Sequence, residues 1–191
     1  MKGYTRVNVV TRDLLKKLKS AGLNRISFGV ESGNQNILDA AKKGTTLDQI
    51  IKAYEIAEEV GLETRLSVVL GLPGETEQTI RNTIKFINKL KCKQAYINIG
   101  TPFPGTEYYE YAKSGVGGLS LLSSNWAEYR RWGNAVISVN DLAPNDLVNW
   151  QRKALLKFYL RPSIILYNLT RADFRSAIRN SFGFVKSFLN K

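Results

Sequence analysis

Short apolar runs alternate with amphipathic stretches along the first half of the chain. The central run covers residues 66–76, in which four apolar residues, broken only by Ser67, stop at Gly71, Pro73 and Gly74. So continuous a run predicts a strand that is buried on both faces. Glu75 and the residues after it, with apolar positions at helical spacing, predict a helix. Strand, turn and helix in this order form a parallel βα unit, whose ligands usually lie at the carboxyl ends of the strands.

The same alternation occurs elsewhere at uneven intervals. Runs rich in β-forming residues occupy 4–10, 25–30 and 94–100, and helical stripes occupy 13–22, 34–43, 46–60 and 77–90. Thr46 and Gln49 have capping-box spacing, and Gly61 supplies a stop. We therefore predict the α/β class, with about four parallel strands.

The second part of the chain has a different character. Residues 114–144 are loop-rich, Pro144 opens a long helix that is broken before Pro162, and a further helical stripe covers 174–189. We predict an α/β part over 1–113 and a loop-rich and helical extension over 114–191. The stripe is compatible with covering this domain, a partner or a membrane surface, and its spacing does not choose among them.

Composition excludes several classes of site. The 191 residues are 43% hydrophobic, and no apolar run is long enough for a transmembrane helix. A single cysteine, Cys92, excludes an internal disulfide and suits a reducing cytoplasm, and we expect it to be a partly buried structural residue. The absence of histidine removes Ser-His-Asp triads and most zinc sites.

The net charge of +12 raises the question of an anionic partner. Residues 145–191 carry 9 Lys and Arg against 2 Asp and Glu, whereas residues 1–144 carry 19 against 14. The aromatic residues of the tail fall at helical spacing, which favours a solvated cationic face over a core-facing stripe and makes nucleic acid an unlikely partner. A non-catalytic basic α/β module that binds nucleic acid or anionic membrane remains the alternative function.

Four runs in order resemble one superfamily. AGLNRISFGVESGNQ, LSVVLGLPGET, INIGTPFPGTEYY and FYLRP are similar to the carboxyl-terminal half of radical SAM enzymes of the cobalamin-binding class, which includes the anaerobic magnesium-protoporphyrin monomethyl ester cyclases. The resemblance implies a partial TIM-type (β/α) barrel with a C-terminal helical extension. It also implies S-adenosylmethionine (SAM), a [4Fe–4S] cluster held by a CxxxCxxC loop, and cobalamin in the parent enzyme. The RNA-modifying methylthiotransferases of the superfamily usually carry a C-terminal β-barrel, which the helical tail argues against.

The sequence departs from this pattern in its cysteines. It has one cysteine and no CxxxCxxC loop, and its first strand, near Tyr4, resembles the family's third. We therefore expect a truncated chain that lacks the N-terminal barrel half and the cobalamin domain and is inactive alone. An unpartnered edge strand also predicts a homo-oligomer. The substrate, a small molecule, cannot be named from these runs.

The resemblance assigns cofactor-binding roles on the strand that ends at Glu31. In relatives this position contacts the SAM ribose or amino-acid portion, and Ser27 and Gly29 lie earlier on the same strand. Lys43 stands where relatives place a cation against the SAM carboxylate. Without a ligand, Glu31 would be a loop carboxylate and Lys43 a helix-ending cation that complements the dipole.

The resemblance also assigns roles on the next strands. Ser67 stands at a polar SAM-contacting position, and Leu70, Gly71 and Leu72 form the turn that lies beneath the adenine in the family. Phe103 is expected to face substrate. Arg6 and Asn8 align with polar positions of the family's third strand. No catalytic residue and no metal ligand is predicted in this chain.

Overall fold

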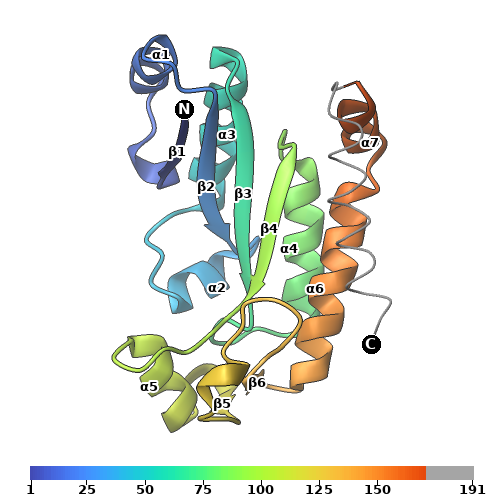
Figure 1. Ribbon diagram of the computed structural model, residues 1–191. Coiled ribbons are helices and arrows are strands. Elements are labelled where there is room, and N and C mark those ends of the chain that lie inside the picture. The colour runs from blue at the N-terminus through green and yellow to red at the C-terminus, as the bar shows by residue number, and fades with distance from the viewer. Residues whose placement is uncertain (171–191) are drawn as a thin grey trace.

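The computed structural model describes residues 1–170 and contains a four-stranded parallel sheet (Figure 1). Its strands lie in the order β1-β2-β3-β4, and all neighbours pair in parallel, which confirms the predicted α/β class and its four parallel strands. The bounds are β1 (Lys2–Thr5), β2 (Arg25–Glu31), β3 (Glu63–Leu70) and β4 (Gln94–Ile99). The helical stripe predicted over 174–189 lies outside the described residues.

Helices return the chain from the end of each strand to the start of the next. They are α1 (Arg12–Ser20), α2 (Gln35–Ala40), α3 (Leu47–Val60) and α4 (Glu77–Lys89), with a 3-10 turn η1 (Val7–Val9) before α1. The capping box of Thr46 and Gln49 and the left-handed stop at Gly61 are both present, as predicted. Thr76 and Thr79 form a second capping box on α4. Asn34 precedes α2 but does not cap it, because its side-chain amide donates to Thr79 and Thr83 instead.

The prediction that the strand after residue 65 is buried on both faces is wrong. Along β3, buried residues alternate with half-buried ones, so that Leu66, Val68 and Leu70 face the helices while Ser67 and Val69 face the other side. The strand therefore has one face packed on helices and one open face. On that open face, polar side chains of β2, β3 and β4 gather.

The segment after β4 forms a cap at the carboxyl edge of the sheet (Figure 1). It contains α5 (Glu107–Ser114), η2 (Val116–Gly118), β5 (Leu119–Leu121), η3 (Trp126–Glu128) and β6 (Ile137–Val139). Strands β5 and β6 pair antiparallel, which the loop-rich interpretation of residues 114–144 did not foresee. The long helix opened by Pro144 is α6 (Pro144–Tyr159), and α7 (Pro162–Leu169) follows.

Helix α6 closes the outer edge of β4. The buried Gln151 amide donates to the carbonyls of Ile97 and Arg131, and the Tyr159 hydroxyl bonds both the N–H and the C=O of Ala95. The N–H of Ile99 donates to Arg131. Side chains and a loop thus occupy the place where a further strand would pair.

The hydrophobic core is one continuous cluster, which contains residues of β2, β3 and β4 together with residues of β5, β6, α6 and α7. Cys92 belongs to it and is more buried than expected, with its thiol bonded to the carbonyls of Thr64 and Gln94. Burial raises the pKa of this thiol, which suits a structural cysteine.

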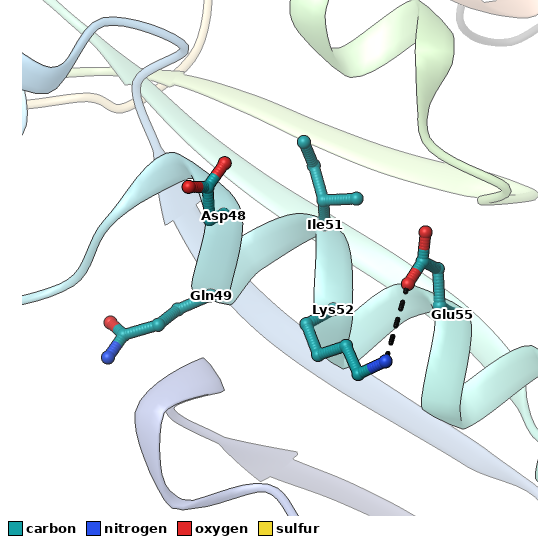
Figure 2. Close-up of a pocket in the computed structure, with 5 residues that line it drawn as sticks. All are labelled: Asp48, Gln49, Ile51, Lys52 and Glu55. Atoms are coloured by element: carbon teal, nitrogen blue, oxygen red, sulfur yellow. Dashed lines mark ion pairs between the residues drawn. The ribbon is translucent and has the colours of Figure 1, made fainter.

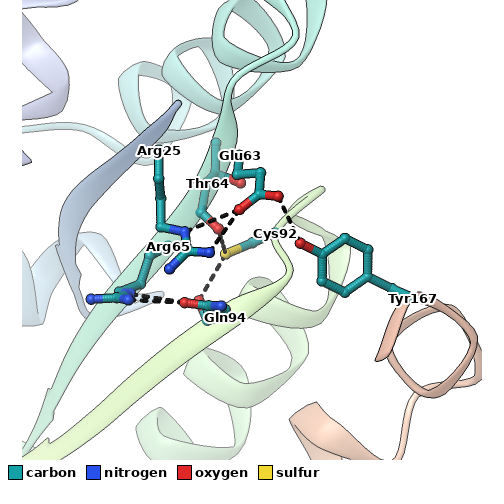
Figure 3. A network of polar contacts seen from close by, with 7 residues as sticks. All are labelled: Arg25, Glu63, Thr64, Arg65, Cys92, Gln94 and Tyr167. Carbon is teal, nitrogen blue, oxygen red and sulfur yellow. Dashed lines mark hydrogen bonds and ion pairs between the residues drawn. The ribbon is translucent and has the colours of Figure 1, made fainter. Parts of the chain in front are cut away.

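A polar network ties α7 to the amino edge of the sheet (Figure 3). Glu63 accepts from the Arg25 guanidinium and from the Tyr167 hydroxyl, while Arg65 donates to the side chain of Gln94. Since these residues begin the strands, the network lies at the end opposite to the carboxyl edge. It fixes α7 there.

Candidate functional site

An ion pair marks the carboxyl end of β2. The Nζ of Lys43 lies 2.7 Å from Oε1 of Glu31, and only 18% and 21% of the two side chains are exposed. Glu31 follows a bulge in the pairing of β2 with β3 and has a left-handed φ of 62°. A non-glycine residue held in this region is strained, and such strain concentrates at functional positions.

Gly29 provides the floor on which this pair rests. A Cβ at this position would lie 2.4 Å from Oε1 of Glu31 and 2.8 Å from Nζ of Lys43. Both distances are closer than atoms can approach, so only glycine leaves room for the pair. The sequence suggested a close approach at Gly29, and the structure shows which groups approach it.

Two further polar residues hold Lys43 in place. The Arg6 guanidinium donates to the main-chain carbonyl of Lys43, and its Nε lies 3.4 Å from Oδ1 of Asn8. The neighbouring Lys42 has a φ of 51° and pairs with Glu107 at the start of α5. The connection after α2 is thus fixed both to the segment after β1 and to the cap.

Ser67 lies beside Gly29 on the open face of the sheet. The register pairs Gly29 with Ser67, and Ser67 with Tyr96. The Asn98 amide donates to the Ser67 hydroxyl at 3.4 Å, a contact that sequence reasoning missed. Ser27 is on the same face but closer to the middle of the sheet, and it is buried. The structure therefore groups Gly29, Glu31, Lys43 and Ser67 and leaves Ser27 behind them.

The turn after β3 is held by the protein itself. Leu70 points into the core, and both main-chain polar groups of Gly71 are occupied, the N–H by the Glu75 carboxyl and the C=O by the Tyr108 hydroxyl at 2.6 Å. Leu72 is half-buried and also donates its N–H to Glu75. What this turn offers a ligand is therefore its shape and the side chain of Leu72.

Glu75 is a buried carboxyl that sequence reasoning placed at the start of a helix. Its side chain is fully buried, and its Oε1 has no hydrogen-bond partner. Burial raises the pKa of Glu75 from 4.5 to about 8, although the N–H donors of Gly71 and Leu72 oppose this shift. The signal that could have identified it is a carboxylate four residues after the glycine of the turn.

Phe103, expected to face substrate, lies in the loop after β4 and is exposed. Its ring centroid is 6.1 Å from that of Tyr129, and Tyr129 lies 5.2 Å from the exposed Trp126. The aromatic row is built from two segments of the cap. Sequence reasoning identified one of its three members.

The donor set at the carboxyl edge fits SAM in part. Glu31 offers a carboxylate to ribose hydroxyls or an ammonium, Lys43 an ammonium to a carboxylate, and Ser67 a hydroxyl. A [4Fe–4S] cluster does not fit this chain, because its only cysteine is buried at the amino edge. Among residues 1–170 no group of three or more Cys, His, Asp or Glu is placed to hold a metal ion.

The most evident surface hollow is elsewhere. It is lined by Asp48, Gln49, Ile51, Lys52 and Glu55, all on α3, and Figure 2 shows that Lys52 and Glu55 pair with one another. One helix face without converging polar groups does not make a ligand site.

Comparisons with known proteins agree on one superfamily. The profile of the Radical SAM superfamily matches residues 3–87. An uncharacterized methyltransferase of Pyrococcus horikoshii is 34% identical over 165 residues, which are 86% of this chain and 35% of that protein. The anaerobic magnesium-protoporphyrin IX monomethyl ester cyclase of Cereibacter sphaeroides is 27% identical over 97% of this chain and 29% of its own length.

A solved structure gives the same indication for the fold. The radical S-adenosylmethionine methyltransferase TsrM from Kitasatospora setae, with cobalamin and a [4Fe–4S] cluster bound, superposes with a TM-score of 0.54 at 22% identity. The match covers 60% of this chain and 23% of that one. The chain spans about a third of the length of the curated relatives described above.

Proposed function

Because the chain belongs to the radical SAM superfamily through its strand-and-helix region, we propose that its carboxyl edge supplies part of a SAM site in a radical SAM enzyme. The observation that carries this proposal is the Glu31–Lys43 pair above Gly29, with Ser67 beside it. The pair joins opposite charges at the carboxyl end of a parallel strand, where ligands of such folds bind.

The pair is suited to the two ends of a zwitterionic ligand. In the proposed complex, Lys43 binds the carboxylate of SAM, and Glu31 accepts from its ammonium or ribose hydroxyls. Ser67 and the turn Leu70–Gly71–Leu72 contact the nucleoside, and Ser27 supports the strand from behind. Prior pairing of Glu31 with Lys43 orients both groups before the ligand arrives.

We further propose the class of the parent reaction. SAM supplies a 5′-deoxyadenosyl radical or a methyl group, and the cyclase and methyltransferase relatives suggest oxidative cyclisation or cobalamin-dependent methyl transfer. This chain alone is proposed to be inactive, because one cysteine cannot hold the cluster. The cluster ligands, the rest of the barrel and a cobalamin domain would come from polypeptide outside this sequence.

Phe103 and the aromatic row beside it are proposed to face the substrate. They lie on the loops that follow the last strand, at the edge where the SAM site is proposed. Exposed aromatic rings stack on planar or apolar ligands. The parts 1–113 and 114–191 would thus share the work, with the first holding SAM and the second covering substrate.

Calorimetric titration of SAM into the full chain tests the proposal. We expect weak binding, and we expect Glu31→Gln and Lys43→Met each to lower the affinity about tenfold or more. Glu63→Gln is the matched control, because its pair with Arg25 is equally close, at 2.8 Å, and similarly covered, but lies at the amino edge. Equal effects of Glu31→Gln and Glu63→Gln, or no binding by the parent chain, would refute the proposal.

A further inference from the structure

Exposed aliphatic side chains are concentrated where α6 meets α7. Of the 16 large hydrophobic residues that are exposed in the described part of the chain, five fall within residues 156–169. They are Leu156, Leu160, Ile165, Leu166 and Leu169. Single exposed apolar residues are ordinary, but a group of this size usually marks an interaction surface.

On α6 these residues share a stripe with lysines. Lys153, Leu156, Lys157 and Leu160 are all exposed, and their spacing of three, four and seven residues places them on one face of the helix. The opposite face carries the buried residues, among them Trp150, Gln151 and Phe158. The outward face of α6 is thus amphipathic in itself, with leucines between lysines.

Helix α7 continues this apolar surface. It contains no charged residue, and its only buried residue is Ile164. Ile165, Leu166 and Leu169 are exposed, whereas the outer face of a water-facing helix is normally polar. Together the exposed aliphatic residues of α6 and α7 and the two lysines form what we call the α6–α7 surface.

Charge distinguishes between the occupants that such a surface could have. Residues 145–191 carry 9 basic against 2 acidic residues, so a second copy of this surface or the rest of this tail would meet it with like charge. Anionic lipid has the opposite charge and an apolar interior. Leucines flanked by lysines are the composition of helices that lie in the bilayer interface. Within residues 1–170, no helix is long and apolar enough to cross a bilayer.

We propose that the α6–α7 surface binds the surface of an anionic phospholipid bilayer. Leu156, Leu160, Leu166 and Leu169 enter the headgroup region, and Lys153 and Lys157 contact lipid phosphates. Tyr167 and Arg161 anchor this surface to the amino edge of the sheet, through Glu63 and the carbonyl of Cys92. The opposite edge, with Glu31 and Lys43, remains open to solvent, so the proposal does not depend on the SAM site.

Co-sedimentation of the full chain with vesicles tests this proposal. We expect binding to vesicles of equal parts phosphatidylcholine and phosphatidylglycerol, weak binding to phosphatidylcholine alone, and a decrease with added salt. The double variants Leu156→Gln/Leu160→Gln and Leu166→Gln/Leu169→Gln should each lower the partition coefficient about tenfold. All four side chains are exposed, so the variants should fold, which circular dichroism verifies.

Leu122→Gln is the matched control. Leu122 is 55% exposed, as Leu169 is, but it follows β5 in the cap at the carboxyl edge. This variant should bind vesicles like the parent chain. The proposal is overturned if the parent chain ignores the mixed vesicles, or if the double variants bind as well as Leu122→Gln does. It is also overturned if light scattering shows that the leucines hold a dimer and vesicles do not compete with it.

Discussion

The buried carboxyl of Glu75 should make the protein less stable as the pH rises through neutrality. Burial raises the pKa of this group to about 8 in the fold, compared with about 4.5 in an unfolded chain. Between these two values the folded state binds a proton that the unfolded state releases. The free energy of unfolding therefore falls with rising pH across this window.

The size of the effect follows from the two pKa values. Each pH unit inside the window corresponds to about 1.4 kcal/mol per proton, and the slope halves as the folded group begins to ionise near pH 8. We expect the free energy of unfolding to fall by about 2 kcal/mol between about pH 6 and about pH 8. The chain contains no histidine, so besides Glu75 mainly the terminal amine titrates in this range.

Urea unfolding followed by circular dichroism at several pH values measures this slope. Glu75→Gln cannot ionise and keeps a carbonyl oxygen for the N–H groups of Gly71 and Leu72, so it should remove the slope and leave the fold intact. Glu110→Gln is the control, because it removes the same charge from the exposed face of α5. A parent chain whose stability is flat or rises over this range, or a Glu75→Gln chain that keeps the slope, would refute the reasoning.

Three other predictions concern the sheet. Gly29→Ala should separate the Glu31–Lys43 pair, lowering stability by about 1–2 kcal/mol and abolishing SAM binding in calorimetry, whereas Gly3→Ala, which meets only the flexible end of a leucine, should do neither. Gln151→Ala should cost about 2–4 kcal/mol in urea unfolding, because it leaves buried main-chain groups unpaired; the exposed Gln78→Ala should cost under about 0.5 kcal/mol, and similar losses would contradict this account. The free edge of β1 should make the chain dimeric or larger, and light scattering that finds a monomer at high concentration would exclude this.

Local signals explain why the order of elements could be predicted from the sequence. The capping pair Thr46 and Gln49, the stop at Gly61 and the proline that opens α6 each act within one turn of chain, so spacing alone reveals them. The hairpin of β5 and β6 escaped prediction because each strand has three residues, which is too few to show a period.

The candidate site was predictable as a list of residues but not as an arrangement. Glu31 and Lys43 are separated by twelve residues, and Arg6 reaches Lys43 from 37 residues away, so only the folded chain shows that they meet. The open face of β3 was missed because Val69 conceals the alternation that Ser67 begins. Glu75 was missed because groups distant in sequence, Tyr108 and Asn140, help to enclose its turn.

The two sides of the sheet differ in a way that limits how it can be extended. At β4 the Gln151 amide, the Tyr159 hydroxyl and the loop at Arg131 already satisfy outward main-chain groups, while β1 has no such cover among the described residues. Growth of the sheet is therefore directional, like a polymer with one blocked end. Any strand that joins it, from whatever polypeptide, must add beside Lys2–Thr5.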